Sequence, residues 1–190
     1  GTTFNTPSIN STTTFYALAS VNGCVEGTRT PVVATIKQIP AITSVADALI
    51  CDSGTAVLIA STNFGVINWY NSLTGGSILS TGNTFTTPLV TNTTTFYVDA
   101  TSSEGCTTVT RRPVTVTVQK TAIPSANALQ TFCDIDTATV GDLTATGTNI
   151  KWYDTATGGS PLNGSELLST KTYYATQTEM GCESNSRLPV

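Results

Sequence analysis

The sequence predicts an all-β chain of tandem two-layer sandwiches, each about 80 residues long. Two observations lead to this prediction. Threonine makes up about one residue in five and occurs with many Val, Tyr, Gly, Pro and Asn residues, a composition typical of short strands joined by turns. The chain also repeats itself, because the stretch VINWYNSLTGG at 66–76 returns as NIKWYDTATGG at 149–159. We find no 3.6-residue apolar period that would indicate helices.

The spacing of landmark residues defines the repeat. The step is 82 residues for Cys24 to Cys106, Pro31 to Pro113 and Cys51 to Cys133, and 83 for Trp69 to Trp152 and Gly76 to Gly159. From Cys106 to Cys182 it shortens to 76, which predicts a shorter surface connection in the last copy. We therefore expect the C-terminal half of a repeat at 1–40, a complete repeat at 41–121, and a repeat lacking most of its last strand at 122–190.

Alternating apolar residues between turn signals predict seven strands in the complete repeat. Their ranges are 42–50, 55–61, 66–71, 77–79, 84–87, 94–101 and 113–118. The third strand ends at a Gly-Gly turn, and the short fourth strand follows it.

The last two strands show the alternation most clearly. In the sixth, Phe96, Val98 and Ala100 are expected to face the core, with Tyr97 and Asp99 facing out. In the last, Val114, Val116 and Val118 are expected to line the core, and Pro113 at its start favours an edge position because proline cannot donate to a ladder. Seven such strands predict an immunoglobulin-like sandwich, with a small barrel as the alternative. The connectors at 38–42 and 119–124 are short and contain proline, which predicts an extended rod.

The five cysteines fall into two classes by register. Cys51 and Cys133 precede the second strand, whereas Cys24, Cys106 and Cys182 follow the sixth in a Gly-Cys pair. We expect disulfides within repeats, Cys51 to Cys106 and Cys133 to Cys182, which leaves Cys24 without a partner in this segment. Disulfides place the chain in an oxidising, extracellular compartment. A metal site would need CxxC spacing or histidines, and the sequence has neither.

Composition excludes several classes of function. The absence of histidine excludes Ser-His-Asp and Cys-His catalysis, so we predict no enzyme activity and no cofactor. A net charge of −4 with eight Lys and Arg residues offers no patch for nucleic acid, and no apolar run is long enough to span a bilayer. Asp134, Asp136 and Asp142 lack the spacing of a calcium loop, so we interpret them as turn residues and predict no metal site.

The repeated aromatic stretch offers the remaining candidates. Trp69 and Trp152 are assigned to the sandwich cores, where a tryptophan of the third strand packs in immunoglobulin-like folds. Tyr70 and Tyr153 fall on the polar face and are candidate contacts for a sugar ligand. The alternative is that these tyrosines cover the edge of the sandwich.

The motif string resembles a known family. The stretches 152–159, 82–88, 95–98, Gly105-Cys106 and 112–114 are similar to the immunoglobulin-like repeats of very large Bacteroidetes surface proteins, which include gliding-motility adhesins exported by type IX secretion. The resemblance implies a non-enzymatic adhesin segment at the cell surface. Asp136-Thr137-Ala138 and Asp154-Thr155-Ala156 are similar to the O-glycosylation acceptor pattern of that phylum, which makes Thr137 and Thr155 candidate acceptors.

Two functions are therefore expected. The first is a disulfide-stapled spacer or adhesive array in surface attachment or gliding motility, whose partners are neighbouring repeats and, as a candidate, surface polysaccharide. The alternative is a carbohydrate-binding accessory module of a secreted multidomain enzyme.

Overall fold

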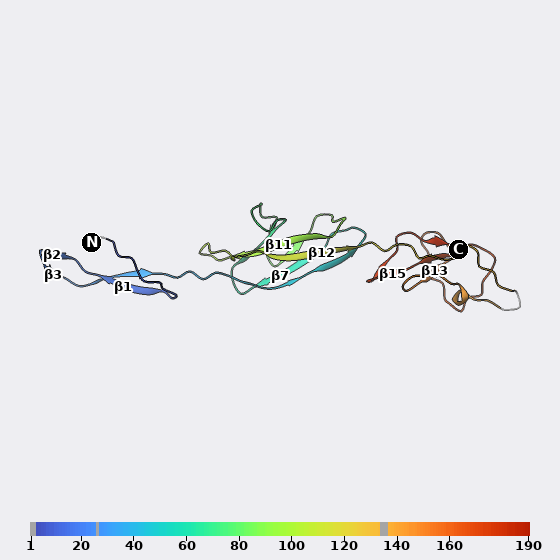
Figure 1. Cartoon of the computed structure of the whole chain (residues 1–190), viewed down its shortest axis with the longest axis horizontal. Helices are drawn as coiled ribbons and strands as arrows, with labels where there is room; N and C mark the ends of the chain where they lie inside the picture. The colour runs from blue at the N-terminus through green and yellow to red at the C-terminus, as the bar shows by residue number, and fades with distance from the viewer. Residues whose placement is uncertain (1–2, 26, 134–136) are drawn as a thin grey trace.

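The computed structural model describes residues 3–25, 27–133 and 137–190, which form three β-rich bodies arranged end to end (Figure 1). The first body ends in the hairpin of β2 (Ser20–Val21) and β3 (Cys24–Val25) at one tip of the molecule. The middle and last bodies each have a hydrophobic core of their own. The predicted all-β architecture is confirmed.

The middle repeat is a two-layer sandwich. Its strands are β5 (Ile42–Ala46), β6 (Ala48–Cys51), β7 (Val57–Thr62), β8 (Val66–Tyr70), β9 (Ser80–Thr81), β10 (Thr84–Thr86), β11 (Thr94–Thr101) and β12 (Arg112–Gln119). One sheet has the order β10-β7-β5, and the other has the order β6-β12-β11-β8-β9. Leu58 of the first sheet and Val98 of the second belong to the same buried cluster, so the core lies between the two layers.

The first predicted strand, 42–50, is wrong as a single element because the chain changes sheets at Asp47. β5 pairs antiparallel with β7, whereas β6 runs parallel to β12 in the opposite layer. The Asp47 carboxylate accepts a hydrogen bond from the backbone N–H of Thr115 at 2.7 Å. This bond holds the crossing point against β12.

Two further predictions about the strands need correction. The fourth strand lies at 80–81 rather than 77–79, because β9 pairs with β8 through Trp69 opposite Ser80. β12 is not an edge strand, since it lies between β11 and β6. The ladder to β6 begins only at Val116, so Pro113 lies where β12 pairs with β11 alone among the described strands. The missing proline N–H is therefore tolerated there.

The repeated tryptophan organises the core of the middle repeat. The Trp69 side chain is fully buried, and its Nε1 donates to the Gly82 carbonyl oxygen at 2.9 Å. Its ring stacks on Phe85 with centroids 5.6 Å apart, and Phe85 meets Phe96 edge-on at 5.2 Å. These contacts tie β8, β10 and β11 together across the two layers.

The last repeat has shorter strands and a smaller core. Its elements are the 3-10 helix η2 (Val140–Asp142) and strands β13 (Lys151–Tyr153), β14 (Tyr174–Thr176), β15 (Thr178–Glu179), β16 (Cys182–Glu183) and β17 (Leu188–Pro189). Trp152 of β13 is buried beside Val140, Tyr173 and Ala175. Asp142 accepts hydrogen bonds from the backbone N–H and the hydroxyl of Thr139, so it caps a turn. Asp134 and Asp136 lie outside the described residues.

The first body is a single layer. β1 (Thr13–Ala17) pairs antiparallel with β4 (Thr30–Ala34), and β2 pairs with β3. Large apolar side chains such as Phe4, Tyr16 and Val32 are exposed. They are exposed because no described strand forms a second layer over this hairpin.

Removing a core tryptophan tests this account. We expect Trp69→Ala to lower the free energy of unfolding of the middle repeat by about 3–5 kcal/mol, because the vacated volume cannot be refilled. Trp152→Ala, at 8% exposure in a smaller cluster, should fall at the lower end of that range. Differential scanning calorimetry of the 190-residue chain measures both changes. Val109→Ala, at an 82% exposed position, is the control and should leave the transitions in place. An unchanged transition in the Trp69 variant would contradict the core assignment.

Candidate functional site

The joint between the middle and last repeats contains the most extensive set of contacts between bodies. The β15–β16 hairpin lies on the side of the last repeat that faces the middle one (Figure 1). It meets the ends of β6 and β12, which finish together at Cys51 and Gln119. The hairpin reaches back to the preceding repeat, and the connector at 120–124 runs beside it.

A disulfide crosses this joint. Cys51 at the end of β6 is bonded to Cys182 of β16, 131 residues further along the chain. The predicted pairing of Cys51 with Cys106 and of Cys133 with Cys182 is therefore wrong. Within the described residues, Cys24 and Cys106 carry no disulfide, and the Cys133 side chain is exposed.

Strand direction explains the correction. β6 runs parallel to β12 and ends beside Gln119, at the end of the sandwich that faces the last repeat. β11 runs antiparallel to β12, so Cys106, which follows β11, lies at the opposite end. The two cysteines of one repeat therefore lie a full sandwich length apart. A cysteine of the next repeat lies closer to Cys51 than Cys106 does.

Hydrogen bonds flank the disulfide. Thr121 Oγ1 donates to the Cys182 carbonyl oxygen at 2.9 Å, and Gln119 Nε2 donates to Glu179 Oε2 at 3.3 Å. Gln177, itself buried, donates through Nε2 to the Ala122 carbonyl oxygen at 2.9 Å. Residues 119–122, which lead into the last repeat, are therefore hydrogen-bonded to the β15–β16 hairpin and to Gln177 just before it.

The turn of the hairpin explains the Gly-Cys pair. Met180 and Gly181, the two residues at the turn, have φ angles of 50° and 83°. Two successive left-handed residues indicate a type I′ turn, which matches the twist of the strands and favours glycine at the second position. Asn22 and Gly23 adopt the same conformation between β2 and β3, with φ angles of 49° and 82°. The glycine therefore shapes the turn that presents the cysteine after it.

The tyrosine after Trp69 is covered by an arginine. Tyr70 is only 7% exposed, and the guanidinium carbon of Arg111 lies 3.2 Å from its ring centroid. Arg111 Nε forms an ion pair with Asp99 Oδ2 at 3.2 Å, and its Nη1 donates to the carbonyl oxygens of Ser72 and Gly75. Burial, reinforced by the Asp99 charge, raises the pKa of Tyr70 despite the opposing charge of Arg111. Arg111 thereby fastens the Gly-Gly loop to the sheet.

Asp99 lies on the outward face of its strand, as predicted, but it is only 4% exposed. Asn68 Nδ2 donates to its Oδ1 at 2.9 Å, in addition to the ion pair with Arg111. The alternation of the strand was assigned correctly, because Asp99 does lie on the face opposite the core. Side chains of neighbouring strands cover that face.

The last repeat has the same arrangement. The guanidinium carbon of Arg187 lies 3.4 Å from the ring centroid of Tyr153, which is 4% exposed, and Arg187 Nη1 donates to the Thr155 carbonyl oxygen at 2.6 Å. Arg111 and Arg187 are 76 residues apart, the same step as from Cys106 to Cys182. This arginine was not singled out from the sequence, although the shared 76-residue step already relates Arg187 to Arg111.

A carboxylate network lies beneath Tyr153. Glu183 accepts hydrogen bonds from Tyr153 Oη at 2.6 Å, from Thr176 Oγ1 at 2.7 Å and from Lys151 Nζ at 2.7 Å. Burial alone would raise the pKa of Glu183, but these three donors outweigh it and lower the pKa to about 2. The hydrogen bond to Glu183 raises the pKa of Lys151.

These contacts bear on the candidate ligand and acceptor residues. Neither Tyr70 nor Tyr153 presents a ring face on which a sugar could stack while its arginine is in place. Thr155 is exposed, but its hydroxyl donates to the Gly158 carbonyl oxygen at 3.3 Å in the Gly-Gly loop. Thr137 is exposed, and its neighbour Asp136 lies outside the described residues.

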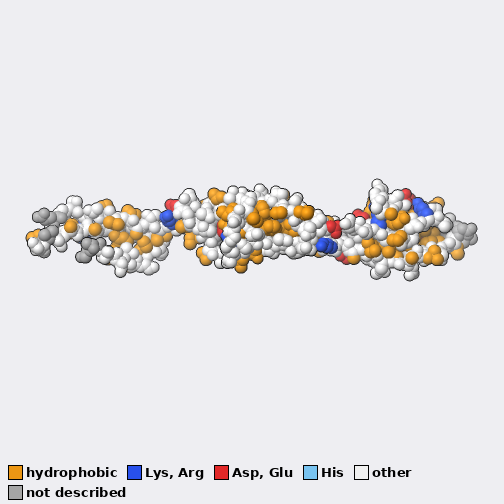
Figure 2. Space-filling view, turned by 90° about the horizontal axis from the view of Figure 1, so that it is seen from above, with side chains coloured by type: hydrophobic (Ala, Val, Ile, Leu, Met, Phe, Trp, Pro, Cys, Tyr) orange, Lys and Arg blue, Asp and Glu red, His pale blue; other side chains and the backbone are white. Residues whose placement is uncertain are grey.

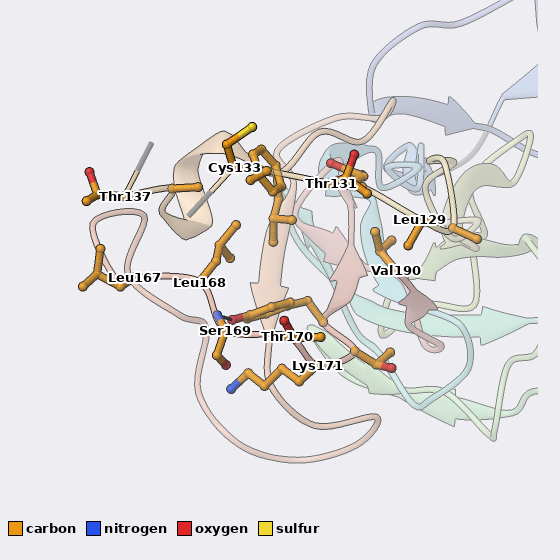
Figure 3. A pocket seen from close by; sticks show the side chains of 17 residues that line it. Leu129, Thr131, Cys133, Thr137, Leu167, Leu168, Ser169, Thr170, Lys171 and Val190 are labelled. Carbon is orange, nitrogen blue, oxygen red and sulfur yellow. Dashed lines mark hydrogen bonds between the residues drawn. The ribbon is translucent and has the colours of Figure 1, made fainter. Parts of the chain in front are cut away.

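A groove of about 730 Å³ opens in the last repeat between residues 128–133 and 167–173 (Figure 3). Its lining includes Leu129 and Leu167, both exposed. The counterpart of 128–133 in the middle repeat is the stretch that contains β6, which pairs with β12. The groove thus lies where the middle repeat has its parallel strand pair, and we assign no ligand to it.

Within the part of the chain that the structure describes, no helix has the length and apolar character of a membrane span. Comparison with known families finds three matches to one family, described as "Ig-like domain CHU_C associated", over residues 1–37, 38–119 and 122–190. A search of curated proteins finds no match. The three matched ranges together cover nearly the whole chain.

The Glu183 network predicts a dependence on pH. The pKa of Glu183 is lower in the folded state than its ordinary value of 4.5, so ionised Glu183 stabilises the fold above pH 4.5. This stabilisation should be lost as the pH falls from 4.5 to about 2. Carbon-13 NMR titration of the Glu183 carboxyl carbon measures the pKa directly.

Tyr153→Phe removes one donor and should raise the pKa of Glu183. Glu166→Gln, in an exposed turn of the same repeat, should leave the Glu183 titration unchanged. Titration of Glu183 near pH 4.5 in the unaltered chain would disprove the network.

Proposed function

Because the chain belongs to the family of immunoglobulin-like domains described as CHU_C associated, we propose that it is a non-enzymatic repeat segment of a large cell-surface adhesin. In this proposal the repeats form a disulfide-stapled spacer and adhesive array that takes part in surface attachment or gliding motility. The array projects a distal binding site away from the cell. Its partners are neighbouring repeats of the same kind.

The observation that carries the proposal is the covalent joint. Two sandwiches arranged end to end could pivot about a connector of a few residues, and the Cys51–Cys182 bond prevents this. Hydrogen bonds from Gln119 and Thr121 hold the same joint. A segment that keeps its repeats aligned has the property that a spacer requires.

The surface chemistry is consistent with a spacer. Charged side chains are sparse on the face that Figure 2 shows, and several of them lie where the bodies meet. A disulfide of this kind persists in an oxidising compartment, which supports an extracellular location. The resemblance to gliding-motility adhesins favours export by type IX secretion.

Mechanical extension tests the spacer role. When the oxidised chain is pulled by its two ends, the force should pass directly through the Cys51–Cys182 disulfide. Residues 52–181 should then bear no load. Reduction should release 131 residue steps, which at about 3.4 Å per residue gives about 450 Å of additional extension. Optical-tweezers measurements with and without dithiothreitol compare the two states.

The double variant Cys51→Ser, Cys182→Ser should show the long extension without reductant. Cys106→Ser, which leaves the bridge intact, should behave as the unaltered chain. Equal extension in both redox states would argue against a load-bearing joint.

Deletion of one repeat tests the cellular role. Removing residues 38–119 from the native gene takes out one matched repeat and preserves the register of the joints. We expect the shortened protein to remain on the cell surface, as measured by antibody labelling of intact cells, while attachment to a solid surface decreases. Normal attachment at normal surface display would refute the array. Binding of the purified segment to a polysaccharide array would instead support the accessory-module alternative.

A further inference from the structure

We propose that the Gly-Cys hairpin of each repeat is a docking element joined by a disulfide to the preceding repeat, so that Cys106 pairs with a cysteine of the repeat before it. The proposal rests on the tandem array proposed above, but not on its role in attachment. It assigns a partner of defined chemistry to Cys106. The partner is a cysteine at the β6 position of an adjacent immunoglobulin-like repeat.

The position of Cys106 supports this assignment. Cys24, Cys106 and Cys182 each follow a glycine with a φ angle of 82° or 83°, at the end of the repeat that faces its predecessor. Cys182 occupies that position and is bonded across the joint. Cys106 carries no disulfide among the described residues, and the residue is partly exposed.

One contact at the first joint has a counterpart at the second. Lys37 Nζ donates to the Glu104 carbonyl oxygen at 3.0 Å, which connects the first body to the loop that presents Cys106. Gln119 lies 82 residues after Lys37 and donates to Glu179, which lies in the hairpin that presents Cys182. At both joints, the residue at this register position, at or shortly after the end of the last strand, therefore contacts the next repeat's cysteine loop. We therefore expect a disulfide to cross the first joint, as one crosses the second.

Topology excludes a partner within the same repeat. Cys51 lies at the far end of the sandwich from Cys106 and is already bonded to Cys182. The cysteine equivalent to Cys51 in the preceding repeat would lie at the end of a strand parallel to β4, as β6 lies parallel to β12. In a continuous array that cysteine is 82 residues before Cys51, and so precedes Gly1. Its strand would end next to Lys37 and therefore next to the Cys106 loop.

Cys24 occupies the same position in the first body. It lies exposed on the β2–β3 hairpin, whose turn matches that of β15–β16. This hairpin forms the tip of the molecule in Figure 1. By the same reasoning, Cys24 forms a disulfide with a cysteine of the repeat that precedes its own.

The bond forms by oxidation of two thiols. Cys106 and its partner each lose a proton, and the pair of electrons passes to the disulfide of a thiol-disulfide oxidoreductase in the exported compartment, which is reduced to a dithiol. Each repeat then takes part in two crosslinks, one at each end. The array is interlocked along its length.

Peptide mapping of the unreduced native protein tests the proposal. Digestion with trypsin and Asp-N places the cysteines on separate peptides, since Cys51 falls in 47–51, Cys106 in 99–111, Cys133 in 121–133 and Cys182 in 172–187. Free thiols are blocked with iodoacetamide before digestion. We expect 47–51 linked to 172–187, and 99–111 linked to a peptide from the preceding repeat.

Each result is decisive for the crosslink. Linkage of 99–111 to 47–51, or alkylated Cys106 in the unreduced protein, would overturn it while leaving the array intact. A native protein with no immunoglobulin-like repeat before residue 1 would lack the partner cysteine and would overturn the crosslink alone, because the three matched repeats of this chain would remain. The expected result is that peptide 99–111 appears, without alkylation, only after reduction and together with its partner peptide from the preceding repeat. This result supports both the crosslink and the array.

Discussion

The parallel pairing of β6 with β12 is the constraint on which the arrangement of repeats depends. It carries Cys51 to the end of the sandwich at which the chain leaves for the next repeat. The antiparallel pairing of β11 with β12 places the other cysteine of the repeat at the opposite end. A sandwich with one cysteine at each end cannot close an internal disulfide, but it can be linked to neighbours on both sides. The covalent chemistry of the joint thus follows from the directions of three strands.

A second feature occurs in both the middle and the last repeat: an arginine side chain lies over a tyrosine ring. In each, the arginine precedes the last strand, covers the tyrosine beside the core tryptophan and donates to carbonyl oxygens of the Gly-Gly loop. Asp99 partners Arg111 in the middle repeat, whereas Glu183 with Lys151 forms the charged network in the last. Buried charges cost free energy unless they are paired and hydrogen-bonded, and the Arg111–Asp99 pair meets that condition. Lys151 and Glu183 are also paired and hydrogen-bonded, but their side chains stay partly exposed to solvent. The face opposite the core is therefore ordered by polar contacts.

The two sandwiches differ in how their stability is distributed. The middle repeat buries Trp69, Phe85 and Phe96 in contact with one another, while the last repeat has shorter strands around Trp152. The last repeat is also attached covalently to the middle one, so its smaller core is supplemented by a crosslink from its neighbour. Neighbouring repeats in such an array stabilise one another, as in other repeat architectures.

Much of the fold could be predicted from the sequence by itself. The all-β class and the burial of Trp69 and Trp152 follow from alternation and register, because these patterns are local and recur at a fixed spacing. Register also placed the cysteines in two classes. What register could not supply was the spatial position of each class, because sequence spacing does not specify strand direction or sheet membership.

The remaining features depend on contacts that form only in the folded chain. The break at Asp47 sends the first strand into both sheets, and the resulting parallel strand sets Cys51 against the next repeat. Asp99 and Tyr70 lie on the predicted outer face, yet Arg111 buries them. In each case a partner distant in the sequence determines the outcome, and only the folded chain brings that partner into contact.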